Sequence, residues 1–105
     1  MHRMLFALAL GLCANCANAT DRKAFEAYCT YVGQTYAYAA ALRDAGVPEA
    51  TVVKRIPPVR TLFAQGTTAR MHRDDIRKLF ERPQITPALA YAYWRDGCLE
   101  RESPP

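Results

Sequence analysis

Two cysteines constrain this chain more than any other feature of its sequence. Cys29 and Cys98 stand near the two ends of the segment that follows an apolar leader. A disulfide between them would close nearly the whole domain, and the entropy that it removes from the unfolded chain corresponds to about 4 kcal/mol of stability. A domain of fewer than about 90 residues buries only a modest share of its surface, so this crosslink would matter for its stability. Two free, buried thiols are the alternative interpretation.

The leader has the features of an export signal. His2 and Arg3 form a short basic region, and the apolar run at 4–14 is too short to span a bilayer. The small residues at 17–19, Ala-Asn-Ala, predict cleavage before Thr20. We therefore expect a periplasmic or secreted protein without a stable membrane anchor, and an oxidising location of this kind favours the disulfide. The predicted division of the chain is a signal peptide at 1–19, a helical domain at 20–100 and a disordered tail at 101–105.

The pattern of apolar residues and stop signals predicts helices and no strands. The first helix is expected to begin at Thr20 or Asp21 and to end before Gly46. Thr86-Pro87 supplies a cap and a first-turn proline for the last helix. The fold class is therefore all-α: a small, disulfide-stapled bundle of four to five helices after a cleaved signal peptide. The expected helices are 20–45, 48–56, 59–65, 67–82 with a cap at Thr67 or Thr68, and 87–96 with an end as late as Cys98.

Most aromatic residues lie on the first and last of these helices, beside the cysteines. A bridge from Cys29 to Cys98 would place the two helices side by side, with large rings filling the seam between them. A packed aromatic core is the simpler interpretation. The alternative is a groove in which Tyr91 and Trp94 stack on a sugar, a peptide or a lipid.

Tyr31 and Tyr38 do not fit the same core. On an ideal helix they point about 180° away from the face that carries Cys29. Small residues lie between them, and tyrosine is common at protein interfaces. Two interpretations stay open: another helix of the same chain covers this face, or the face meets a partner or a second copy of the chain. The candidate binding residues are therefore Tyr31, Tyr38, Tyr91 and Trp94.

No set of residues suggests catalysis, and we expect a non-enzymatic protein without a metal or another cofactor. His72 is the only histidine after the leader and lacks enough neighbouring ligands for a metal site, so we interpret it as packed on the apolar face of its helix. Ser103 is the only serine and lies in the tail, which argues against serine chemistry. Basic residues at 70–78 alternate with acidic ones, which predicts a solvated face with salt bridges. The net charge of +4 is too small to indicate a nucleic-acid partner.

The order of several features resembles a type of small exported helical protein of proteobacteria. These features are the export signal, a cysteine in the first helix, the segment LRDAGVPEA, the later LFERPQITP, and an aromatic helix that closes in Gly-Cys. The resemblance implies a helical fold in which one disulfide links the first and last helices, and it supplies no catalytic residues. Periplasmic acid chaperones are similar in size, helicity and single disulfide, which is an analogy of architecture alone.

These observations favour an interaction module that binds a protein or an envelope component through its helix surfaces. A stress- or acid-activated holdase chaperone is the first alternative. A binder of a small ligand, with the aromatic seam as its site, is the second. A homodimer is compatible with each of the three.

Overall fold

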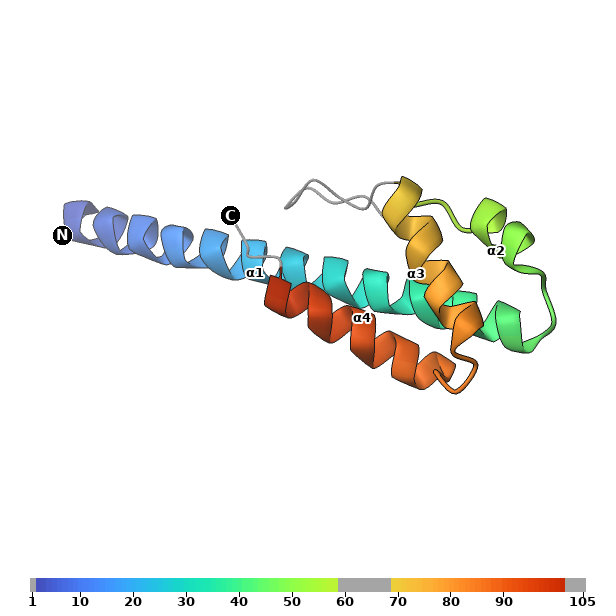
Figure 1. The fold of residues 1–105 in the computed structure, drawn as a ribbon. Coiled ribbons are helices and arrows are strands. Elements are labelled where there is room, and N and C mark those ends of the chain that lie inside the picture. Colours follow the sequence, from blue (N-terminus) through green and yellow to red (C-terminus); the bar gives the residue numbers. More distant parts are fainter. Residues whose placement is uncertain (1, 59–68, 102–105) are drawn as a thin grey trace.

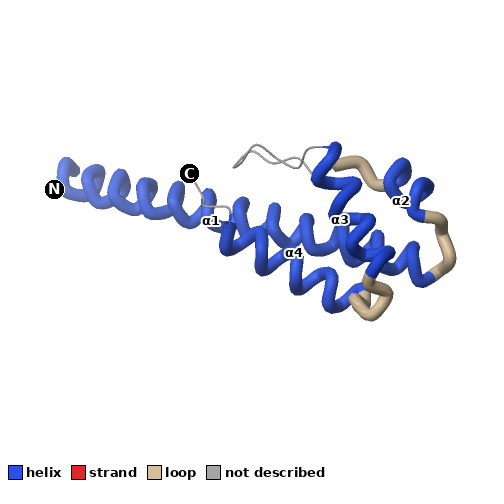
Figure 2. Tube along the Cα trace, viewed as in Figure 1, coloured by secondary structure: helices blue, strands red, loops and turns tan. Residues whose placement is uncertain are grey.

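The computed structural model describes the backbone of residues 2–58 and 69–101 and the side chains of residues 21–58 and 69–100. Four helices make up this part of the chain: α1 (His2–Asp44), α2 (Glu49–Arg55), α3 (Ala69–Glu81) and α4 (Pro87–Arg101). No strand occurs among the described residues (Figure 2). A disulfide joins Cys29 on α1 to Cys98 on α4. The predicted all-α, disulfide-stapled bundle is confirmed.

α1 and α4 form the long axis of the bundle. They lie side by side and run in opposite directions, while α2 and α3 cover the carboxyl-terminal half of α1 (Figure 1). Gly33 permits close contact between α1 and α4, because a Cβ at this position would stand 2.8 Å from the carbonyl oxygen of Tyr91 and 3.0 Å from the Cβ of Arg95. The amino-terminal half of α1 projects beyond the other helices (Figure 1).

The start of α1 differs from the prediction, and its end agrees with it. The helix begins at His2 and passes through Thr20 without a break, because residues 4–19 are rich in alanine and leucine, which favour helix. It ends where glycine permits a left-handed conformation: Gly46 has φ +87°, and its N–H donates to Arg43 O at 2.9 Å. Val47 N–H donates to Leu42 O at 3.0 Å, which completes a Schellman motif.

The shorter helices α2 and α3 begin or end close to the residues predicted for them. α2 has Pro48 as its N-cap and Ile56 as its C-cap, within one residue of the expected bounds at each end. Glu81 ends α3 before the proline at 83. The expected helix at 59–65 and the expected caps at Thr67 and Thr68 lie outside the described residues.

α4 begins as predicted and continues further than predicted. The amide of Leu89 donates to the Thr86 side-chain oxygen at 3.1 Å, which confirms the cap. Gly97 does not stop the helix, which extends to Arg101. Glycine inside a helix costs about 1 kcal/mol relative to alanine, and packing of Cys98 and Leu99 against the core compensates for that cost. The first residue of the expected tail is therefore helical, and residues 102–105 lie outside the described part.

One apolar core runs along the α1–α4 contact and extends under α2 and α3. It is rich in small and aromatic side chains, which lets the helices approach closely around the disulfide. Its buried members are Phe25, Cys29, Val32, Tyr36, Ala39, Ala40, Val52, Ile56, Ile76, Leu79, Ala90, Trp94 and Cys98.

Candidate functional site

The aromatic seam between α1 and α4 is packed. Trp94 is only 4% exposed and stacks on Tyr36, with 4.6 Å between ring centroids and 22° between ring planes. The edge of Tyr93 adds a second contact at 4.9 Å. Tyr91 is half-buried beside Gly33. The packed interpretation therefore accounts for Trp94, because a ligand that stacked on this ring would first have to displace Tyr36 or Tyr93.

A polar network crosses the core at Tyr36 and His72. His72 is buried, and its Nε2 donates to the carbonyl oxygen of Ile56 at 2.5 Å. Its Nδ1 lies 3.4 Å from the Tyr36 hydroxyl, which donates to Asp75 Oδ2 at 3.1 Å. No buried side-chain nitrogen or oxygen among the described residues lacks a hydrogen-bond partner. The network ties α1 to the end of α2 and to α3, so His72 is a packed structural residue, as predicted.

The environment of Tyr36 also affects its ionisation. Burial, above all, raises the pKa of the Tyr36 hydroxyl well above its usual value, because an ionised phenolate would lose its hydration. The neighbouring Asp75 carboxylate raises this pKa further, since two negative charges would repel each other. Tyr36 is therefore a neutral hydrogen-bond donor in the fold.

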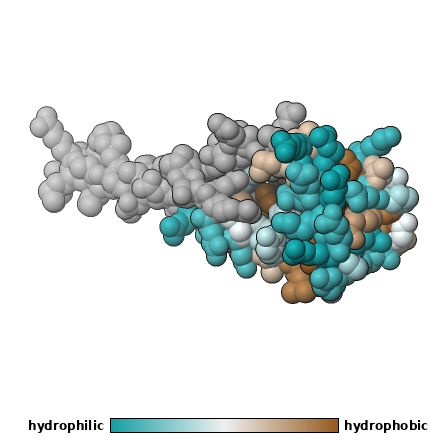
Figure 3. Space-filling view, in the orientation of Figure 1, coloured by the Kyte–Doolittle hydropathy of each residue, from teal (hydrophilic) through white to brown (hydrophobic). Residues whose placement is uncertain are grey.

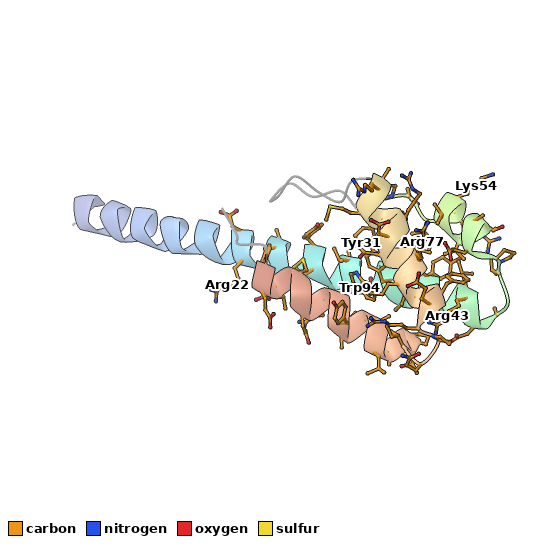
Figure 4. The ribbon with its side chains drawn as sticks, viewed as in Figure 1. Arg22, Tyr31, Arg43, Lys54, Arg77 and Trp94 are labelled. Atoms are coloured by element: carbon orange, nitrogen blue, oxygen red, sulfur yellow. A yellow bond between two sulfur atoms is a disulfide. The ribbon has the colours of Figure 1, made fainter. Side chains whose placement is uncertain are left out.

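Arg43 acts as a clamp that the sequence did not reveal. Its side chain is 6% exposed and reaches from the end of α1 toward the turn between α3 and α4 (Figure 4). Nη1 donates to Leu79 O at 2.8 Å and to Arg82 O at 3.3 Å, and Nη2 donates to Ile85 O at 2.7 Å. These carbonyls belong to the last turn of α3 and the segment after it, where helical backbone acceptors have no partner within the helix. Arg43 therefore fixes the turn that leads into α4.

Tyr31 and Tyr38 lie on the exposed side of α1. Their exposed fractions are 52% and 51%, so no described helix covers them. They line a groove of about 280 Å³ together with Gln34 and Thr35 of α1 and with Arg55, Ile56 and Pro57 at the end of α2. We call this groove the tyrosine face (Tyr31 is labelled in Figure 4). Arg55 is exposed and forms no ion pair with a described residue, so the face carries an unneutralised positive charge.

A second hollow lies where α3 and α4 diverge from their connecting turn. It measures about 190 Å³ and is lined by Lys78, Arg82, Ile85, Leu89 and Tyr93. Leu89 and Tyr93 are each 57% exposed. Figure 3 shows hydrophobic surface at this end of the molecule within a largely hydrophilic surround. Sequence reasoning did not find this hollow, because its members come from two helices whose relative position depends on the turn.

The predicted salt bridges along α3 do not form among the described residues. The ion pair that involves this helix joins Arg77 to Glu49 of α2 at 3.8 Å, whereas Asp74 and Glu81 form none. Long exposed side chains gain little from pairing in water, because solvent screens the charges and ordering costs entropy. Apart from Arg77, the basic side chains of α3 form no ion pair with a described residue.

Among the described residues, no cluster of three or more His, Cys, Asp or Glu side chains could hold a metal ion. In the same part of the chain, no helix has the length and apolar character needed to cross a membrane.

Comparisons with protein-family models, with curated proteins and with solved structures find no match. Function must therefore be inferred from the surfaces of this chain alone.

Proposed function

We propose that this protein is a non-enzymatic interaction module that is exported and binds a protein or an envelope component through the tyrosine face. The observation that carries the proposal is the exposure of Tyr31 and Tyr38 on one side of α1, around a groove that ends at Arg55. Tyrosine gives a large contact area with few rotatable bonds, so little side-chain entropy is lost on binding.

The way in which α1 is held supports the same proposal. The disulfide at Cys29 and the close approach at Gly33 attach the opposite side of α1 to α4. The two tyrosines are therefore presented on a helix that is already fixed before a partner arrives. A surface that is ordered in advance binds more tightly, because less disorder is removed when the complex forms.

Export is proposed from the leader and from the disulfide. Disulfides persist mainly in oxidising compartments, and the chain begins with a basic region, an apolar run and an Ala-Asn-Ala segment. The intact mass of protein recovered from the native host tests this. A mass that begins at Thr20, with no alkylation of cysteines before reduction, is expected; an uncleaved chain or two reactive thiols would contradict it.

The binding proposal is tested by crosslinking from within the groove. A photoreactive amino acid at Gln34 should capture a specific protein or envelope component in native cells, and the captured species should then bind purified protein. Tyr31→Ala/Tyr38→Ala should reduce this binding by about tenfold or more, since interface tyrosines often contribute over 1 kcal/mol each. Because both rings are half-exposed, the melting temperature should stay close to that of the wild type.

The same photoreactive group at Arg73, which is exposed on α3 outside the groove, is the matched control. Capture from both positions alike would mean nonspecific proximity. Capture of only a second copy of the chain would make the face a homodimer interface. A collapsed melting temperature in the double variant, with unchanged oligomer size, would assign the tyrosines to the core and refute the proposal.

A further inference from the structure

The hollow between α3 and α4 has the properties of a second binding site. We call it the α3–α4 cleft and define it by Lys78, Arg82, Ile85, Leu89 and Tyr93. Its apolar wall is exposed to solvent, since Leu89 and Tyr93 each keep more than half of their surface accessible. Exposed apolar side chains that gather around a concavity mark interaction sites more often than scattered ones do.

Positive charge borders the apolar wall on one side. Lys78 Nζ lies 5.7 Å from the centroid of the Tyr93 ring, over its face, and Arg82 is exposed just after the end of α3. Neither cation forms an ion pair with a carboxylate of the described residues. No acidic side chain lines the cleft. A ligand that complements it therefore combines an apolar group with negative charge.

The cleft is rigid at its closed end. Arg43 donates to the carbonyl oxygens of Leu79, Arg82 and Ile85, which lie in the last turn of α3 and in the segment that joins it to α4. On the α4 side, Tyr93 rests against the buried ring of Trp94. The walls therefore keep their spacing without a ligand, which lowers the entropic cost of binding.

Size decides what kind of ligand the cleft accepts. Its volume of about 190 Å³ is below the roughly 300–1,000 Å³ of pockets that enclose whole small molecules. The cleft accommodates a large side chain rather than a lipid with long acyl chains.

We propose that the α3–α4 cleft binds an acidic segment of a protein partner. One large apolar side chain of that segment enters between Ile85, Leu89 and Tyr93, and carboxylates beside it pair with Lys78 and Arg82. This site is separate in residues and in chemistry from the tyrosine face, and it holds whether or not that face binds anything.

The test uses a fluorescein-labelled peptide in which one phenylalanine is flanked on each side by two glutamates. Anisotropy should show saturable binding that weakens as salt is added, because the ionic contacts are exposed. A peptide with glutamines in place of the glutamates should bind about tenfold more weakly, as expected for the loss of two exposed ion pairs. A peptide with alanine in place of phenylalanine should also bind more weakly. Trp94, the only tryptophan, gives an independent fluorescence signal through its contact with Tyr93.

Variants of the protein locate the site. Lys78→Gln/Arg82→Gln should weaken binding of the acidic peptide by about tenfold. Leu89→Ala should weaken it by removing part of the apolar wall, and its exposed position leaves the fold intact. Arg70→Gln/Arg73→Gln is the matched control, because it removes the same charge from exposed positions of α3 outside the cleft.

Three results would overturn the proposal. Equal loss of binding in the control variant would mean that only net charge matters. Equal affinity for a peptide with lysines in place of the glutamates would exclude charge complementarity. Saturable binding of octanoate or inorganic phosphate at Lys78 and Arg82, without binding of the acidic peptide, would assign the cleft to a small anion. Each of these results leaves the crosslinking test of the tyrosine face unaffected.

Discussion

At the scale of single residues, the buried polar groups Tyr36 and His72 do the most to make this fold specific. A purely apolar core of helices tolerates sliding, whereas a buried hydroxyl and a buried imidazole each require partners at fixed distances. Tyr36 reaches Asp75 and His72, and His72 reaches Ile56. A shift of α1, α2 or α3 that breaks these contacts would leave a buried polar group without a partner.

The Tyr36 hydroxyl gives a prediction about alkaline pH. Tyr36→Phe should lower the free energy of unfolding by about 1–2 kcal/mol at neutral pH, because the Asp75 carboxylate loses the hydroxyl that donates to it. The folded-state pKa of Tyr36 is raised, so the hydroxyl stays protonated in the fold above about pH 10, where it ionises in the unfolded chain. The contribution of this hydroxyl to the free energy of unfolding is therefore fully present below about pH 10. Above that pH it declines by up to about 1.4 kcal/mol per pH unit.

Urea denaturation of the two proteins between about pH 8 and about pH 11 measures this effect. The stability difference between wild type and Tyr36→Phe should shrink as pH rises past about 10. Tyr31→Phe removes an exposed phenol and controls for the loss of a hydroxyl as such. A stability difference that stays constant over the whole range would show that Tyr36 is not protected from ionisation by the fold.

At the scale of helices, the ends of the elements depend on contacts of two kinds. α1 ends at Gly46 and α4 begins after Thr86 through hydrogen bonds between neighbours in sequence. Those ends were predictable, because the residues that make them lie within a few positions of one another. α4 continues past Gly97 because of packing against α1, and no local signal indicates that.

The candidate surfaces show the same division. Helical periodicity correctly predicts that Tyr31 and Tyr38 lie on a different face of α1 from Cys29, because the faces of a single helix follow from its own repeat. Whether another helix covers the two tyrosines depends on where the chain goes after α2, and the sequence left that question open. The cleft at Lys78 and Leu89 depends on the angle between two helices, which Arg43 sets through carbonyls 36 to 42 residues away in sequence.

This role of Arg43 gives a prediction about helix assembly. Arg43→Ala should lower the free energy of unfolding by about 2–3 kcal/mol, because the part-buried carbonyl oxygens of Leu79 and Ile85 lose charged donors. Arg43→Lys should recover only part of this loss, since one ammonium group lacks the planar geometry of the guanidinium. Arg95→Ala is the control: its side chain is more exposed and pairs with the adjacent Asp96, so the change should be within about 0.5 kcal/mol. Equal stability of Arg43→Ala and wild type in urea denaturation would contradict the clamp.

At the scale of the whole molecule, one disulfide spans 69 positions, and the closed loop contains every buried member of the described core except Phe25. Closing so long a loop restricts the unfolded chain, and by the chain-entropy account it contributes about 4 kcal/mol. Small domains are stable by only about 5–15 kcal/mol, so the crosslink is a large part of the total. Partial unfolding of the oxidised chain still leaves α1 and α4 joined, with their aromatic faces able to separate around the bridge.

That property makes the choice between an interaction module and a holdase chaperone testable. Tyr36 and Trp94 are stacked in the core, so the near-ultraviolet dichroism of the protein should report when α1 and α4 separate. For an interaction module, heating or acidification that removes this signal should also abolish binding of the captured partner. Aggregation of an unrelated client should then proceed unchanged in a light-scattering assay.

For a holdase, suppression of client aggregation should appear over the same transition, because exposed apolar surface is then the active form. The variant Cys29→Ala/Cys98→Ala, which should lose the signal under milder conditions, must shift either response in parallel. Suppression of aggregation that tracks the loss of dichroism in both proteins would refute the module and establish the chaperone, whereas suppression by the fully folded protein at neutral pH would contradict both.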